Sequence, residues 1–199
     1  MANAVQACSQ MVRIDTVKTP KNVYRRFVEF EEEAAAIYLH FASHFSRDPQ
    51  LSSFWLDMAM HEKQHAGLLQ FCLRDGLFAS DLPVSAEIQK LVGFFKRLEK
   101  RAGNPKLTVE KAFSLAIEME TSEINAIYCH LTTTLHSSMY LLRRKIAASL
   151  PNHIDELVAA ARKFGAGNHD MQELNRLKEH CSAQWQPHTS CCRQRGRTL

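Results

Sequence analysis

The stretch MAMHEKQHAGLL, residues 58–69, places Glu62 three residues ahead of His65 inside a pattern that is helical throughout. Around this pair, mostly apolar residues recur at alternating steps of four and three, which is typical of a helix face packed against other helices. The residues on this stripe are Leu51, Trp55, Met58, Glu62, His65, Leu69 and Cys72. The sequence therefore predicts that an acid and an imidazole are buried together.

The composition indicates one globular domain, or a domain with a tail. The chain has 199 residues, of which 45% are hydrophobic, enough to bury a continuous core. Its formal net charge is +4, but Arg193, Arg195 and Arg197 supply three of these charges, so the rest is nearly neutral and no nucleic-acid partner is expected. We find no apolar run of signal-peptide length in residues 1–20 and none of about 18 residues elsewhere. We expect a cytoplasmic protein without a membrane partner, with its six cysteines reduced.

Glycine and proline are scarce, and they divide the chain into helical segments. The long segments cover residues 22–46, 50–75, 107–136 and 151–182, and a shorter helix over 84–101 lies between the second and the third. Alternating strand patterns flanked by turn pairs are missing. An all-α fold is predicted, with an N-terminal arm over 1–21, a helical bundle over 22–182 and a Cys/Arg-rich tail over 183–199.

Two further helices carry acidic residues on their buried stripes. The first long segment has the stripe Phe27, Glu31, Ala34, Tyr38, Phe41 and Phe45, and the third has Val109, Phe113, Ala116, Glu120, Glu123 and Ile127. An ionised carboxylate in a core is costly unless it is compensated, and several together repel each other. Lysine and arginine lie mainly off these stripes, so one or two bound cations are the simplest compensation.

The spacing of these residues suits a metal site. Side chains three positions apart on a helix point in nearly the same direction, so Glu62 can act with His65, and Glu120 with Glu123. Carboxylates mixed with imidazoles favour iron or manganese over calcium. His40, His44, His136 and His153 receive no role from this reasoning.

Three motifs resemble the rubrerythrin branch of the ferritin-like di-metal carboxylate proteins. They are EEEAAAIY (31–38), HEKQHAGLL (61–69) and EMETSEINAIY (118–128), and the resemblance covers about residues 22–182. It implies a ferritin-like four-helix bundle with an extra short helix between the second and third long helices. It also implies that Glu31, Glu62, His65, Glu120 and Glu123 hold the metal, and that Tyr38 and Tyr128 hydrogen-bond the carboxylates. No catalytic residue beyond the metal ligands is expected.

The fourth long segment departs from the family pattern. Its sequence KFGAGNHDMQEL (163–174) contains His169, a further candidate ligand, but Ala166 occupies the position of the acid three residues before it. Gly165 and Gly167 flank the gap, so this helix is expected to bend or break there. A mononuclear site, an asymmetric dinuclear site completed by water, and a decayed site all remain open. No C-x-x-C pair is present, so the family's rubredoxin-like electron-transfer module is absent.

The resemblance implies an iron protein, with one or two ions, that reacts with peroxide or oxygen and serves in oxidative stress. Manganese and zinc are alternative metals. Such an oxidoreductase would need an external electron donor and would form a homodimer. Two other functions stay open: iron sequestration or sensing without turnover, and a helical interaction module whose metal site is vestigial.

Overall fold

The computed structural model describes residues 19–79, 82–83, 85–122, 153–165, 167, 171–172 and 174–176, and the described part is all-α. Its helices are α1 (Pro20–His44), α2 (Pro49–Asp75), α3 (Ser85–Ala102) and α4 (Val109–Glu120), followed by a helix over residues 153–164. These bounds confirm the first two long helices and the shorter helix. None of the helices in the described part of the chain is long and apolar enough to cross a membrane.

The helix ends carry the capping residues that the sequence supplies. Thr19, Asp48 and Thr108 each accept a hydrogen bond from a backbone N–H of the first turn of the helix that follows. Helix α2 ends at Gly76, whose φ of 68° is in the left-handed region that favours glycine. These local signals set the lengths of α1 and α2, and hence the level at which their buried acids lie.

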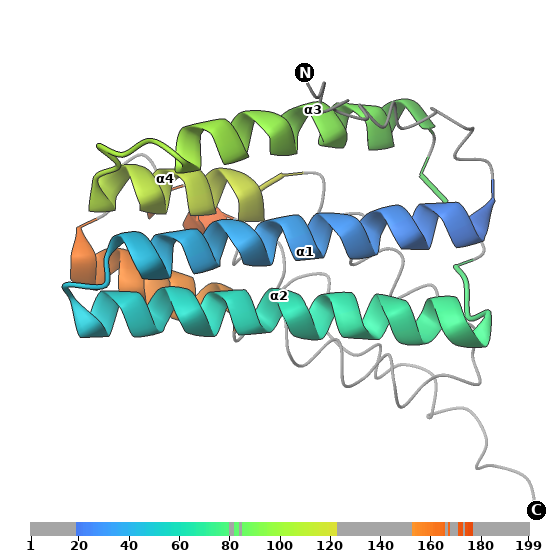
Figure 1. Ribbon diagram of the computed structural model, residues 1–199, viewed down its shortest axis with the longest axis horizontal. Coiled ribbons are helices and arrows are strands. Elements are labelled where there is room, and N and C mark those ends of the chain that lie inside the picture. Colours follow the sequence, from blue (N-terminus) through green and yellow to red (C-terminus); the bar gives the residue numbers. More distant parts are fainter. Residues whose placement is uncertain are drawn as a thin grey trace, which may run out of the picture.

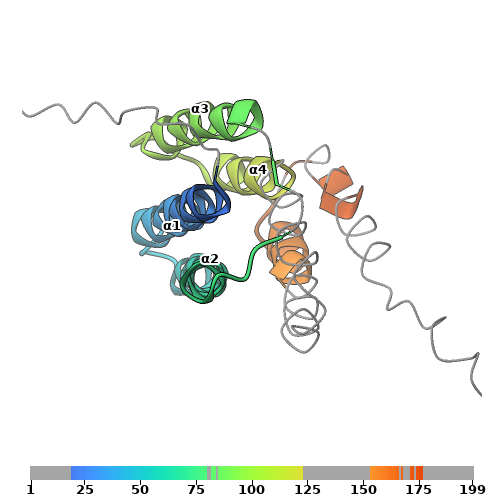
Figure 2. The same cartoon turned by 90° about the vertical axis from the view of Figure 1, so that its right-hand side faces the viewer.

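Four helices surround the core, and α3 lies outside them. Figure 1 shows α1 and α2 running side by side along the molecule. In the end view of Figure 2, α1, α2, α4 and the orange helix over 153–164 occupy four corners, while α3 covers α1 and α4. The ferritin-like bundle with an additional short helix between its second and third long helices therefore matches the observed arrangement.

An aromatic cluster joins the four core helices at one end. Trp55 of α2 is fully buried, and its ring centroid lies 5.7 Å from that of Tyr38 on α1 and 4.8 Å from that of Phe113 on α4. Phe113 in turn stacks on Phe164, with 6.3 Å between ring centroids. Large buried aromatic side chains contribute strongly to core stability. Because these rings come from four different helices, their contacts hold the helices in position relative to one another.

The third long helix is shorter than predicted. The sequence pattern indicated one helix over 107–136, but α4 ends at Glu120, and residues 123–136 lie outside the described part. The hydroxyls of Thr121 and Ser122 donate to the carbonyls of Ile117 and Met119, at 2.7 and 2.6 Å. Such side-chain bonds compete with helix continuation, so the prediction of an uninterrupted helix here was wrong.

The break predicted in the fourth long segment is present. The helix over 153–164 stops at Gly165, which has a φ of 91° and donates its N–H to the carbonyl of Ala161. A side chain would strain this backbone conformation. Gly165 therefore separates residues 153–164 from the helical residues described at 171–172 and 174–176.

Candidate metal centre

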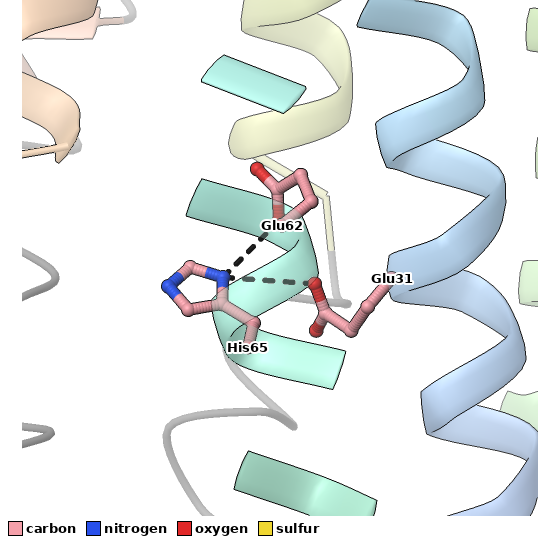
Figure 3. A group of neighbouring side chains, drawn as sticks. All are labelled: Glu31, Glu62 and His65. Carbon is pink, nitrogen blue, oxygen red and sulfur yellow. Dashed lines mark hydrogen bonds and ion pairs between the residues drawn. The ribbon is translucent and has the colours of Figure 1, made fainter. Parts of the chain in front are cut away.

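Glu31, Glu62 and His65 come together between α1 and α2. The Nδ1 atom of His65 lies 3.1 Å from Oε2 of Glu62 and 3.6 Å from Oε2 of Glu31, and Figure 3 shows the imidazole facing both carboxylates. Their spacing places Glu62 and His65 on one face of α2, and Glu31 approaches from α1. The three side chains are almost completely buried, and ligand atoms from all three lie within 4.8 Å of one another.

A second group shares Glu62 with the first. His153, on the helix over 153–164, places its Nε2 atom 2.9 Å from Oε1 of Glu120 and 3.4 Å from Oε1 of Glu62. Ligand atoms of Glu62, Glu120 and His153 again lie within 4.8 Å of one another, and all three residues are buried. Four helices thus direct three carboxylates and two imidazoles to one place in the core.

Tyr38 supports the second group from α1. Its hydroxyl donates a hydrogen bond of 2.7 Å to Oε1 of Glu120, and its ring is fully buried against Trp55. Burial raises the pKa of Tyr38 well above 10, and the negative charge of Glu120 raises it further. The phenol therefore stays protonated and acts as a donor to this carboxylate.

The pKa values of the first group diverge. Burial raises the pKa of Glu31 from 4.5 to about 8. Burial alone would also raise the pKa of Glu62, but the charge of His153 and the hydrogen bond from His65 outweigh it and lower that pKa to about 2. Burial would lower the pKa of His65, but its hydrogen bonds to Glu31 and Glu62 raise it to about 10. Without metal, Glu31 and His65 therefore both favour their protonated forms at neutral pH.

The pKa of His153 is shifted by the same two kinds of effect. Burial would lower its pKa, but the charges of Glu120 and Glu62 raise it. The two carboxylates that face its Nε2 atom therefore favour the protonated form of His153. A metal ion would displace the protons from the ligand atoms, because only the deprotonated forms bind metal.

The donor set fits a di-metal carboxylate centre. Oε1 of Glu31 is buried and has no hydrogen-bond partner among the residues described. A buried carboxylate oxygen without a partner is costly and needs an explanation such as an ion. Carboxylate oxygens together with two imidazoles are the ligands of iron and manganese sites, so the residues present are suited to such metals.

Four of the six ligands predicted from the sequence lie in the described part of the chain. Glu31, Glu62, His65 and Glu120 converge, as does Tyr38, which was predicted to hydrogen-bond a carboxylate. The remaining predicted residues, Glu123, His169 and Tyr128, lie outside the described residues. Their roles stay predictions.

His153 is the residue that the sequence reasoning missed. The Glu-x-x-His spacing of the family points only to the region around His169, whereas His153 stands sixteen residues before His169. A signal was available, since His153 begins a buried stripe that continues through Leu157 and Ala161 to Phe164. Extending the stripe analysis to this helix would have placed an imidazole on its buried face.

The fold and the buried group define a ferritin-like helical bundle with a carboxylate and histidine cluster that could bind metal. The family model described as Rubrerythrin matches residues 28–140, more than half of the chain, and the protein belongs to this family. This family implies binding of a metal, typically iron. No curated protein matches the chain significantly, and no solved structure does so either.

Proposed function

We propose that this protein binds two iron ions at the cluster and uses them to react with peroxide or oxygen. The observation that carries the proposal is the position of Glu62. Its Oε2 atom faces His65 at 3.1 Å, and its Oε1 atom faces His153 at 3.4 Å. A carboxylate whose two oxygens face two separate ligand groups is suited to bridge a pair of cations.

The remaining residues divide between the two positions. Glu31 and His65 would hold one ion with Glu62, and Glu120 and His153 would hold the other. His153 thereby provides the ligand that Ala166 does not. Among the three possibilities left open by the sequence, the shared position of Glu62 favours an asymmetric dinuclear site over a mononuclear or decayed one.

When bound, a ferrous pair supplies the two electrons that, with two protons, reduce hydrogen peroxide to two water molecules, and an external donor then returns these electrons. The protein would contribute a buried, water-poor environment, carboxylates that adjust to the changed charge, and the Tyr38 hydroxyl that holds one oxygen of Glu120. Burial of all five ligand residues supports this reading, because charge interactions are stronger in a dry core. A homodimer belongs to the same proposal, and sedimentation velocity of the purified chain would test it.

Metal content tests the first half of the proposal. We expect about two iron ions per chain after anaerobic reconstitution with Fe(II), measured by elemental analysis. Glu62→Gln should bind much less iron at both positions, because an amide cannot bind two cations as a carboxylate does. The matched control is Glu118→Gln. Glu118 is an exposed acid on the same helix as Glu120, and it pairs with Arg101 instead of the cluster. Iron contents of Glu62→Gln and Glu118→Gln that equal that of the wild type would contradict the proposal.

Peroxide consumption tests the second half. Oxidation of protein-bound Fe(II) by peroxide should be faster than oxidation of free Fe(II), and Glu62→Gln should remove the difference. Iron binding without faster oxidation would instead favour sequestration or sensing. A chain that binds no iron at all would favour the helical interaction module with a vestigial site.

A further inference from the structure

The two ring nitrogens of His153 face two different environments. Nε2 points to the candidate metal centre, 2.9 Å from Oε1 of Glu120. Nδ1 points the other way and lies 3.2 Å from Nδ1 of His61 on α2. The sequence pattern assigns no role to either histidine, and the proposed function involves only the Nε2 side of His153.

His61 stands between the buried centre and solvent. It directly precedes Glu62 in α2, and its side chain is 26% exposed, whereas the side chain of His153 is 2% exposed. The same Nδ1 atom of His61 also lies 3.8 Å from Oε2 of Glu156, a half-exposed acid on the same helix as His153. His61 can therefore be changed without opening a large cavity in the core.

Hydrogen-bond chemistry assigns a direction to the contact between the two histidines. A neutral imidazole carries its proton on one nitrogen only. If Nε2 of His153 binds a metal ion, that nitrogen carries no proton, so the proton of His153 resides on Nδ1. Nδ1 of His61 must then accept this hydrogen bond, and His61 keeps its own proton on Nε2.

We infer that His61 is a positioning residue: it accepts the Nδ1 proton of His153 and thereby holds the Nε2 lone pair of His153 toward Glu62 and Glu120. This inference rests on the proposed function and deepens it, because it concerns how one metal position is held. Hydrogen bonds of this kind orient a metal-binding imidazole and fix its tautomer, and their loss lowers metal affinity by about 10- to 100-fold.

Two variants of His61 separate positioning from bulk. His61→Leu fills similar space without an acceptor, and the affinity for the second of the two metal ions should fall by about 10- to 100-fold. His61→Asn places a carbonyl oxygen near the position of Nδ1 and should recover most of the affinity. His40→Leu is the matched control, because His40 is an exposed histidine on α1 whose ring neighbours His44 rather than the centre.

The experiment is a Co(II) titration of the full chain, followed by visible absorption and elemental analysis. Unchanged affinity in His61→Leu, with normal binding by the wild type, would overturn the inference and leave the proposed function intact. Failure of the wild type to bind Co(II) and Fe(II) would overturn both. Equal losses in His61→Leu and His61→Asn would overturn the inference as well, because the contact would then matter only for packing.

A second readout observes the tautomer itself. In Zn(II)-loaded protein with nitrogen-15-labelled histidine, we expect the NMR signals of His153 to report a proton on Nδ1 and a metal-bound Nε2. His61→Leu should broaden or shift these signals, and His40→Leu should not. A wild-type His153 with its proton on Nε2 would contradict the inference directly.

Discussion

The Nε2 atom of His153 lies 2.9 Å from Oε1 of Glu120, although 33 positions of sequence separate the two residues. This contact joins α4 to the helix over 153–164 at the level of Glu62. It supplies a second imidazole to the cluster in a chain whose family motif is incomplete around His169.

Removing the second imidazole should halve the metal content. In His153→Ala, Glu62 and Glu120 lose their shared partner, whereas Glu31, Glu62 and His65 keep their geometry. We expect the iron content after reconstitution to fall from about two ions to about one per chain. Elemental analysis measures this, with His40→Ala as the control, and an unchanged content would exclude His153 as a ligand.

Metal-free protein should lose stability as the pH rises from about 4.5 to about 10. Burial raises the pKa of Glu31 to about 8, and hydrogen bonds to Glu31 and Glu62 raise that of His65 to about 10 against the effect of burial. Both groups bind protons more tightly when folded, so Glu31 stabilises fully below about pH 4.5 and His65 below about pH 6.5. Each contribution is lost as the pH rises through the pKa of that group in the folded protein. The free energy of unfolding, measured by urea unfolding at several pH values in the presence of chelator, would show this loss.

Glu31→Gln provides the control for this pH dependence. The amide resembles the protonated acid and does not titrate, so the loss of stability toward pH 9 should be smaller in this variant. Metal affinity of the wild type should change in the opposite direction and increase with pH, because the metal displaces protons from its ligands. Parallel stability profiles for the wild type and Glu31→Gln would contradict the assignment of the effect to Glu31.

Loss of the Tyr38 hydroxyl should weaken both the fold and the metal site. Tyr38→Phe retains the stacking on Trp55 but removes one of the two partners of Oε1 of Glu120, which keeps its contact with His153. Loss of one such hydrogen bond costs about 0.5–1.5 kcal/mol. Tyr24→Phe is the matched control, because that buried hydroxyl accepts a hydrogen bond from the N–H of Ala79 and not from the cluster. Both variants should lower the unfolding free energy, but only Tyr38→Phe should change metal affinity.

Two glycine substitutions should have opposite effects on stability. Gly165 has a φ of 91°, so Gly165→Ala should lower the unfolding free energy by about 1–2 kcal/mol. Gly67 lies in the interior of α2, where an added Cβ would meet no atom within 4 Å. Gly67→Ala should therefore raise the unfolding free energy by about 0.5–1 kcal/mol. Thermal unfolding of both variants tests this, and a stabilising Gly165→Ala would disprove that the helix must end there.

Much of the candidate site could be predicted because its information is local. Glu31, Glu62, His65 and Glu120 lie on apolar stripes whose period is that of a helix, and all four are buried. The capping residues Thr19 and Asp48 likewise act within one turn of the chain. Periodicity and caps depend only on neighbours in sequence, so the first helices and their inward faces were accessible without a structure.

The errors arose where the outcome depends on distant partners or on competing local bonds. Periodicity favoured a helix through Thr121, but the hydroxyls of Thr121 and Ser122 bond back to the helix and end it. The buried stripe of its own helix marks His153 as an inward-facing residue, but its partners lie on α2 and α4, and no spacing within one helix identifies them.

The sequence alone determined that this is an all-α chain of the ferritin-like type with an acid and an imidazole buried on α2, because helical periodicity is written into consecutive residues. Only the tertiary structure decided which residues complete the cluster. The packing of four helices brings His153 to Glu62 and Glu120, and sets His61 behind it across 92 positions of sequence. Such contacts depend on how helices pack and rotate against one another, which a pattern within one helix does not contain.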